Sequence, residues 1–221
     1  MVKWAGGLYL LYLGVKLLRA GVSSAELAAP SASSARHARS PALKFAAFFR
    51  NLNLGRPPAP ARIQFEEAFA AAGAEEPRSF LTNGSLVFSA KNRQRASQVL
   101  SIARRNLVSA CGLQEPAFLR EVEYLAGLVA LEPFAYIDRS TVYGCYVTFL
   151  PENFASIGER PAANRRGDVA VVQYTEAELL SCALQLGKSP GSPNAFAEKA
   201  FQMQATTRAW NTIVRLVERH A

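Results

Sequence analysis

The stretch from Leu43 to Ala90 constrains the fold most, because its hydrophobic pattern changes period twice. It opens with Lys44 to Phe49, a short apolar run with three phenylalanines, which predicts a buried strand. Three prolines between residues 57 and 60 then exclude a helix or a central strand until about Ala61. The polar stretch 50–56 is therefore predicted to be a loop that follows a strand.

A helix is expected directly after these prolines. Its apolar residues recur three or four positions apart, as one buried helical face requires: Ala61, Phe65, Ala68, Phe69 and Ala72. Gly73 is a natural C-terminal stop for this helix.

Strand chemistry returns between Arg78 and Ala90. The pair Asn83-Gly84 favours a two-residue turn, because both central residues of such a turn need positive φ. That turn predicts a hairpin with Thr82 opposite Ser85 and Phe80 opposite Val87, and with bulky residues buried at positions 80, 86 and 88.

The rest of the first half completes a β-α-β-β-α-β order, the ferredoxin-like arrangement. A helix is expected from Lys91 to Gly112, a short edge strand at 116–120 and further helical turns at 121–129. Five basic side chains fall off the apolar face of the first of these helices: Lys91, Arg93, Arg95, Arg104 and Arg105. They form either a solvated exterior or a ridge for nucleic-acid phosphates, but no aromatic residue is interleaved to stack bases.

A second half repeats the mixture of strands and helices. Strands are expected at 141–150 and 168–174, and 178–186 reads as a strand or a helix. Helices are expected at 151–157 and 195–203, and a last helix after Thr206-Thr207, one of which should cap it. We therefore predict an α+β chain with two ferredoxin-like (α/β-plait) halves in tandem, 43–130 and 131–221, of which the second is degenerate and ends in helices.

The first 42 residues differ from this body. Residues 1–22 are expected to form an apolar helical leader, too short for a standard membrane span, and 23–42 a flexible linker rich in alanine and serine. The net charge of the chain is +8, and half of it comes from residues 1–42. The body is only mildly basic, which weakens an argument for nucleic acid from charge alone.

Most standard catalytic sites are excluded. The three cysteines are far apart and indicate free, mostly buried thiols in a reducing compartment such as the cytoplasm. The two histidines, His37 and His220, lie near the chain ends, which removes most zinc and serine-hydrolase sites. No glycine-rich phosphate motif is present. We assign no catalytic residue, no metal ligand and no cofactor.

Three blocks of the body, in order, resemble one bacterial family. They are AAFFRNLNLGR at 46–56, SFLTNGSLVFSA at 79–90 and EKAFQMQATTRAWNTIVRL at 198–216. They are similar to the ALLRGINVGG loop, the TYIQSGNVVFSS hairpin and the closing helix pair of the domain of unknown function 1697 family. The resemblance covers about residues 43–216 and implies two α/β-plait halves, but no activity.

The leader has a separate resemblance. VKWAGGLYLLYLGVKLLRAG, at residues 2–21, is similar to one transmembrane helix of the LysE-type amino-acid exporter family. It allows a peripheral membrane contact through residues 1–20, with the basic side chains reaching the surface. The alternative is a gene-fusion remnant or a misplaced start codon.

The polar positions matched in the family blocks suggest a ligand site: Arg50, Asn53, Gly55, Gly84, Thr207 and Arg208. A strand-end loop beside a helix start would offer charged donors and free N–H groups to an anion, such as the phosphate of a nucleotide or of RNA. Alternatively, the two arginines pair with carboxylates or helix ends, and Asn53 caps the loop backbone. This chain departs from the family pattern at four positions: Asn51 and Arg56 replace glycines, and Ala209 and Asn211 stand where the family usually has asparagine and arginine.

Three classes of function follow. The first is a soluble cytoplasmic binding or regulatory module with an anion site. The second is a membrane-associated fusion or remnant of an exporter gene. The third is an enzyme acting on a phosphorylated small molecule, which ranks lower because no histidine is placed to serve as a general base.

Overall fold

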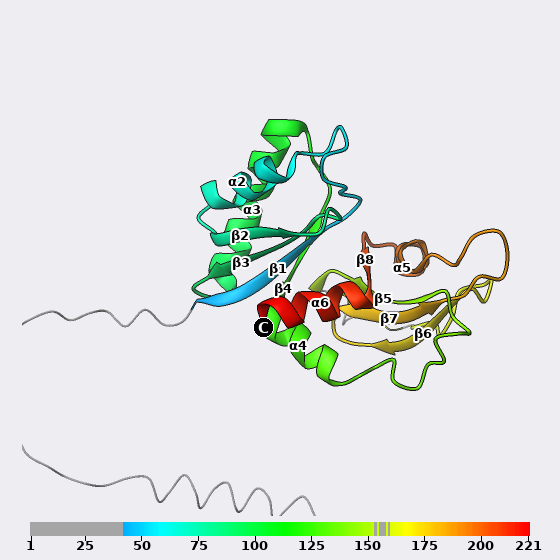
Figure 1. The fold of residues 1–221 in the computed structure, drawn as a ribbon. Helices are drawn as coiled ribbons and strands as arrows, with labels where there is room; N and C mark the ends of the chain where they lie inside the picture. The colour runs from blue at the N-terminus through cyan, green and yellow to red at the C-terminus, as the bar shows by residue number, and fades with distance from the viewer. Residues whose placement is uncertain (1–41, 153, 155–157, 159) are drawn as a thin grey trace, which may run out of the picture. The chain divides into compact units, whose positions relative to one another are not determined.

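The computed structural model describes residues 42–152, 154, 158 and 160–221 (Figure 1). The predicted leader, 1–22, and almost all of the linker, 23–42, lie outside the described residues. The same holds for most of the short helix expected at 151–157.

The first half has the expected element order. Its elements are β1 (Leu43–Phe49), α2 (Arg62–Ala71), β2 (Glu75–Phe80), β3 (Ser85–Ala90), α3 (Arg93–Cys111), β4 (Ala117–Glu121) and α4 (Val122–Ala130). The strands form one antiparallel sheet in the order β2-β3-β1-β4. This order confirms the ferredoxin-like prediction and places β4 at an edge.

The ends of α3 follow from local chemistry. At its start the side chain of Asn92 accepts a hydrogen bond from the backbone N–H of Arg95, with 2.8 Å between the heavy atoms. At its end Gly112 adopts a left-handed conformation with φ of 71°. Glycine takes this conformation without the steric cost that a Cβ imposes.

The hairpin register differs from the prediction. Phe80 pairs with Ser85, and Arg78 pairs with Val87, so four residues connect the strands instead of two. Positive φ falls on Leu81 and Gly84 instead of on two adjacent central residues. The shift has a tertiary cause: carbonyls of the connection accept hydrogen bonds from other parts of the chain, including one from the backbone N–H of Phe49 to Gly84 O at 2.8 Å.

The second half has a similar order. Its elements are β5 (Gly144–Phe149), β6 (Val169–Tyr174), β7 (Glu178–Ala183), α5 (Pro193–Phe201), β8 (Thr206–Ala209) and α6 (Trp210–His220). Its antiparallel sheet has the order β6-β7-β5-β8, which matches that of the first half strand by strand. The ambiguous stretch at 178–186 is a strand, and the helix predicted at 195–203 is α5.

One prediction fails at the last helix. Thr206, Thr207 and Arg208 belong to β8, which pairs with β5, and α6 begins only at Trp210. Neither threonine caps α6, whose N-cap position is Ala209. Because these residues are strand residues, they supply no helix N-terminus to a ligand.

A shared core joins the two sheets. The outer face of the first sheet is covered by α2 and α3, whereas α4 and α6 lie against its other face and against the second sheet (Figure 1). At the junction Phe48 of β1 stacks on Phe149 of β5, with ring centroids 4.2 Å apart and planes 9° apart. Helix α5 covers the opposite face of the second sheet.

The start of β1 also meets the end of α6. The Lys44 ammonium donates a hydrogen bond to His220 O at 2.7 Å. The His220 ring in turn packs edge-on against Phe80.

Candidate functional site

Arg50 follows β1 directly and links the two halves. Its Nε and one terminal nitrogen donate to the two carboxylate oxygens of Glu198 in α5, at 2.6 and 3.2 Å. The other terminal nitrogen donates to Glu115 at 2.9 Å. These hydrogen bonds raise the pKa of Arg50 above its usual value, so the side chain is a fixed cation. A bidentate pair of this kind fixes orientation as well as charge.

The partner carboxylate belongs to a network that crosses α5. Hydrogen bonding to Arg50 lowers the pKa of Glu198, which also accepts from the backbone N–H of Ala205 at 3.1 Å. Asn194 hydrogen-bonds to Glu198 and accepts from the Thr207 hydroxyl at 3.2 Å. Arg50 and Thr207 therefore lie at two ends of one hydrogen-bonded chain, as part of the structure and not as free donors.

Arg208 is buried, with 7% of its surface exposed. It donates to the end of β1 at Phe49 O and to the hairpin connection at Asn83 O, both at 2.8 Å, and to the Ser85 hydroxyl at 3.1 Å. Two further hydrogen bonds stay within β8. Burial lowers the pKa of Arg208 to about 10, which leaves it charged at neutral pH. We call this group the Arg208 cluster.

Arg120 of β4 makes the counterpart of these contacts. It is 5% exposed and donates to Leu150 O and Ala177 O of the second half, both at 3.0 Å. Its Nε donates to the carboxylate of Glu178, which is fully buried and also accepts from the Tyr124 hydroxyl. Burial, and then this hydrogen bond, raise the pKa of Tyr124 to about 12. We call this group the Arg120 cluster.

The two predicted glycines have structural roles. Gly55 has φ of 79° and donates its N–H to Pro60 O at 3.0 Å, which closes the loop after β1. Gly84 has φ of 72°, and a Cβ there would stand 2.6 Å from the Cβ of Leu52. Both positions therefore require glycine for conformational reasons, and at Gly84 also for space.

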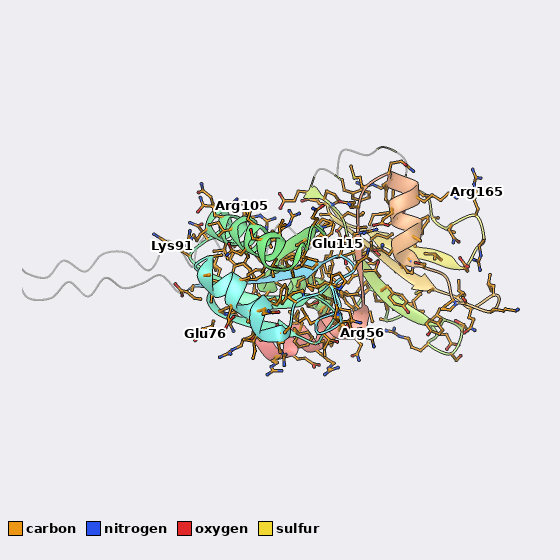
Figure 2. The ribbon with its side chains drawn as sticks, turned by 90° about the horizontal axis from the view of Figure 1, so that it is seen from above. Arg56, Glu76, Lys91, Arg105, Glu115 and Arg165 are labelled. Atoms are coloured by element: carbon orange, nitrogen blue, oxygen red, sulfur yellow. The ribbon has the colours of Figure 1, made fainter. Side chains whose placement is uncertain are left out.

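The loop after β1 lines an open cavity of about 620 Å³, which we call the loop cavity. Its walls are residues 50–53, 56–59 and 111–116, together with Gln204. Arg56 is exposed at its rim, and among the described residues no side chain pairs with it. Figure 2 shows Arg56 and Glu115 well apart from Arg105 and Lys91.

The structure thus divides the predicted site residues. Arg50 and Asn53 line the loop cavity, whereas Gly55, Gly84, Thr207 and Arg208 do not. The first loop and β8 do lie side by side, since Arg208 donates to the carbonyl of the residue before Arg50. Sequence reasoning missed Arg56, which it noted only as a departure from glycine, and Gln204.

Further observations bear on the classes of function. Among the described residues, no group of three or more acidic, histidine or cysteine side chains could hold a metal ion. Over the same residues, every helix is too short or too polar to traverse a bilayer. All three cysteines are free, and Cys145 faces Cys182 across β5 and β7 with 3.5 Å between the sulfurs. Burial raises the pKa of the Cys182 thiol to about 12, which keeps it protonated.

Comparison with known proteins agrees with this fold. A family model described as "Protein of unknown function (DUF1697)" matches residues 43–179. It does not reach the leader, so it gives no support to the exporter resemblance. The solved structure of the conserved bacterial protein SP0830 from Streptococcus pneumoniae is similar, with a TM-score of 0.55 and 13% identity over 80% of this chain and 98% of that one. No curated protein matches.

Proposed function

The chain belongs to the DUF1697 family of proteins of unknown function, and we propose that its body is a binding module for a small phosphate-bearing molecule, held in the loop cavity. The observation that carries this proposal is the pairing of a fixed arginine with a free one on the same cavity wall. Arg50 is held in place by two carboxylates, while Arg56 has no partner among the described side chains.

The size and shape of the cavity support a small ligand. Its volume of about 620 Å³ lies within the range that small-molecule sites occupy. The wall also carries amide side chains at Asn51, Asn53 and Gln204, which can donate to phosphate or sugar oxygens. The concave shape, the unpaired Arg56 and the amide groups together favour an anionic, hydrogen-bonding ligand.

The two arginines of the cavity wall have different roles. Arg50 uses three of a guanidinium's five N–H donors on its two carboxylate partners, so it contributes orientation more than net charge. Arg56 is the one arginine of the wall without a carboxylate partner among the described residues. It is therefore the residue on which affinity for phosphate should depend most, and Arg50 the residue that positions the loop.

We also propose that the protein works in the cytoplasm. The buried, unlinked thiols of Cys145 and Cys182 support a reducing compartment, since a facing pair of this kind would be open to oxidation elsewhere.

The test is a calorimetric titration of the purified full chain with inorganic phosphate, nucleoside monophosphates and a short RNA. We expect a mononucleotide to bind, and Arg56→Gln to weaken it by roughly tenfold, the effect of losing one charge-assisted hydrogen bond. Arg105→Gln is the matched control, because Arg105 lies on the exposed side of α3 away from Arg56 (Figure 2). Absence of binding to any of the three, or equal binding by both variants, would exclude the site.

A higher affinity for RNA than for the mononucleotide would indicate a different binding surface. If that response fell with Arg105→Gln and not with Arg56→Gln, the basic face of α3 would be the binding surface, and the loop cavity would not.

A further inference from the structure

A second cavity lies in the second half, on the exposed side of α5. It has a volume of about 540 Å³ and is formed by the loop 161–168, the segment 190–192 and one face of α5. We call it the α5 cavity. Figure 2 shows Arg165, one of its lining residues, far from Arg56 and Glu115, so this cavity is separate from the loop cavity.

Its first wall is fixed by local hydrogen bonds. The Asn164 amide donates to the Asp168 carboxylate at 2.5 Å, and the Asn164 carbonyl oxygen of the side chain accepts from the backbone N–H groups of Asp168 and Val169. Gly167, with φ of 70°, closes the turn by donating to Asn164 O at 3.0 Å. The loop is therefore formed before any ligand arrives.

The second wall is locked against the first. Gly191 donates to Leu184 O at 2.9 Å, and a Cβ at Gly191 would stand 2.0 Å from Asp168 O. Only glycine permits this close approach of the two segments. A preformed cavity of this kind binds without the entropic cost of ordering its walls.

The lining of the α5 cavity divides by chemistry. Its interior surface is largely apolar, with three alanines, two prolines and a phenylalanine: Pro161, Ala163, Pro190, Ala195, Phe196 and Ala200. Its rim carries Arg165, Arg166 and Lys199. An apolar interior below a cationic rim fits a ligand with one apolar and one anionic end.

The only acidic side chain in this lining is already neutralised. Asp168 is buried, and its carboxylate forms an ion pair with Arg166 at 2.8 Å. This leaves Arg165 and Lys199, both exposed, and neither has a partner among the described side chains. The rim therefore keeps two uncompensated positive charges next to the apolar interior.

We propose that the α5 cavity binds a small amphipathic anion, with its apolar part against Phe196 and the neighbouring alanines and its carboxylate, sulfonate or phosphate at Arg165 and Lys199. Charge complementarity selects the head group, and the apolar interior selects the tail. This site is independent of the loop cavity and of the function proposed for it.

The test uses ligands that share a tail and differ in the head group. The full chain is titrated with the fluorescent amphipathic anion anilinonaphthalene sulfonate, which is then displaced with octanoate, octanol or octylammonium. We expect octanoate to displace the probe at the lowest concentration and octylammonium at the highest. The double variant Arg165→Gln/Lys199→Gln should weaken octanoate by roughly three- to tenfold, as expected for two exposed ion pairs, and leave octanol unchanged.

Two further variants make the result decisive. Ala200→Trp narrows the cavity at its apolar lining and should abolish binding of the probe, and binding of octanoate and octanol followed by calorimetry, with a melting temperature close to wild type because residue 200 is exposed. Arg105→Gln, which removes a distant exposed arginine, should change nothing. Failure of the probe to bind, displacement that ignores head-group charge, or a double variant that behaves like Arg105→Gln would overturn the proposal.

Discussion

The two halves carry an arginine at the same place in their sheets, yet only one of these arginines faces a carboxylate. Arg120 pairs with Ala46 of β1, and Arg208 pairs with Val147 of β5, in the same register. Each reaches across the junction to a carbonyl at the end of the other half's central strand, Phe49 or Leu150. The contacts of the two clusters are therefore equivalent when the two halves are interchanged.

The difference lies at one position of the facing strand. Ser85 pairs with Phe48, and Glu178 pairs with Phe149, so serine and glutamate occupy equivalent places. Arg208 is nevertheless as buried as Arg120, because carbonyl and hydroxyl oxygens satisfy it. The comparison teaches that a buried guanidinium needs acceptors more than it needs a counter-charge. It also suggests that the two clusters will respond differently when they are damaged.

The largest effect is expected at the Arg120 cluster. Arg120→Met leaves the buried carboxylate of Glu178 without its cation, and breaking such a pair costs about 3–5 kcal/mol of the free energy of unfolding. Urea denaturation measures the change. The double variant Arg120→Met/Glu178→Gln should regain most of it, because it no longer buries a charge. If the double variant is as unstable as the single one, charge is not the cause.

A smaller effect is expected at the Arg208 cluster. Arg208→Met removes five hydrogen bonds but strands no opposite charge, so the loss should be about 2–3 kcal/mol. Adding Ser85→Ala should bring no recovery, in contrast to the Arg120 cluster. Recovery of more than half the loss in Arg208→Met/Ser85→Ala would show that the two clusters work alike.

The hairpin connections give a third contrast. Gly84 and Ala177 hold equivalent carbonyls, which accept from the N–H groups of Phe49 and Leu150 at 2.8 Å. Gly84→Ala should cost about 1–3 kcal/mol, because φ is 72° and the new Cβ would meet Leu52. Ala177→Gly should cost about 0.5–1 kcal/mol, from chain entropy alone. Thermal unfolding of both variants measures the two losses of stability, and equal losses would contradict the predicted difference.

Arg50 provides a further link between the halves, and its effect should be the smallest. Because Arg50 lowers the pKa of Glu198 in the folded state, this pair stabilises the fold above the unfolded pKa of glutamate and loses that contribution as pH falls through the folded pKa. The free energy of unfolding of the wild type should exceed that of Glu198→Gln by no more than about 1 kcal/mol at pH 7. The two should converge under acid conditions, as followed by urea denaturation across pH. If the difference in stability persists at low pH, it arises from packing of the side chain and not from its ionisation.

Much of the fold was predictable because it depends on patterns of residues that are close in sequence. The apolar run before Arg50, the helical spacing after Ala61 and the stop at Gly112 each depend on neighbours in sequence, and all three predictions were confirmed. The hairpin register was wrong because carbonyls of that connection are used by distant groups, including Arg208. Thr206 and Thr207 looked like helix caps, but pairing with β5 draws them into a strand.

The candidate site was less predictable for the same reason. Arg50 lies 65 and 148 positions from the two carboxylates that hold it, so no local pattern could identify them. The sequence predicted no role for Arg120, because hydrophobic periodicity assigns a residue to a face of a strand but does not identify its partner in the other half. Arg56 remains free because no carboxylate of the described chain reaches it, a property that only the assembled loop reveals.

The contact between Lys44 and His220 brings the entry to β1 and the exit from α6 to one spot on the surface. A peptide of a few residues could therefore bridge Ala42 and Ala221, and the chain could be cut anew at an exposed connection to give a circular permutant with the same interior. A segment attached directly at Ala42 and one attached at Ala221 would leave the described body from this single corner.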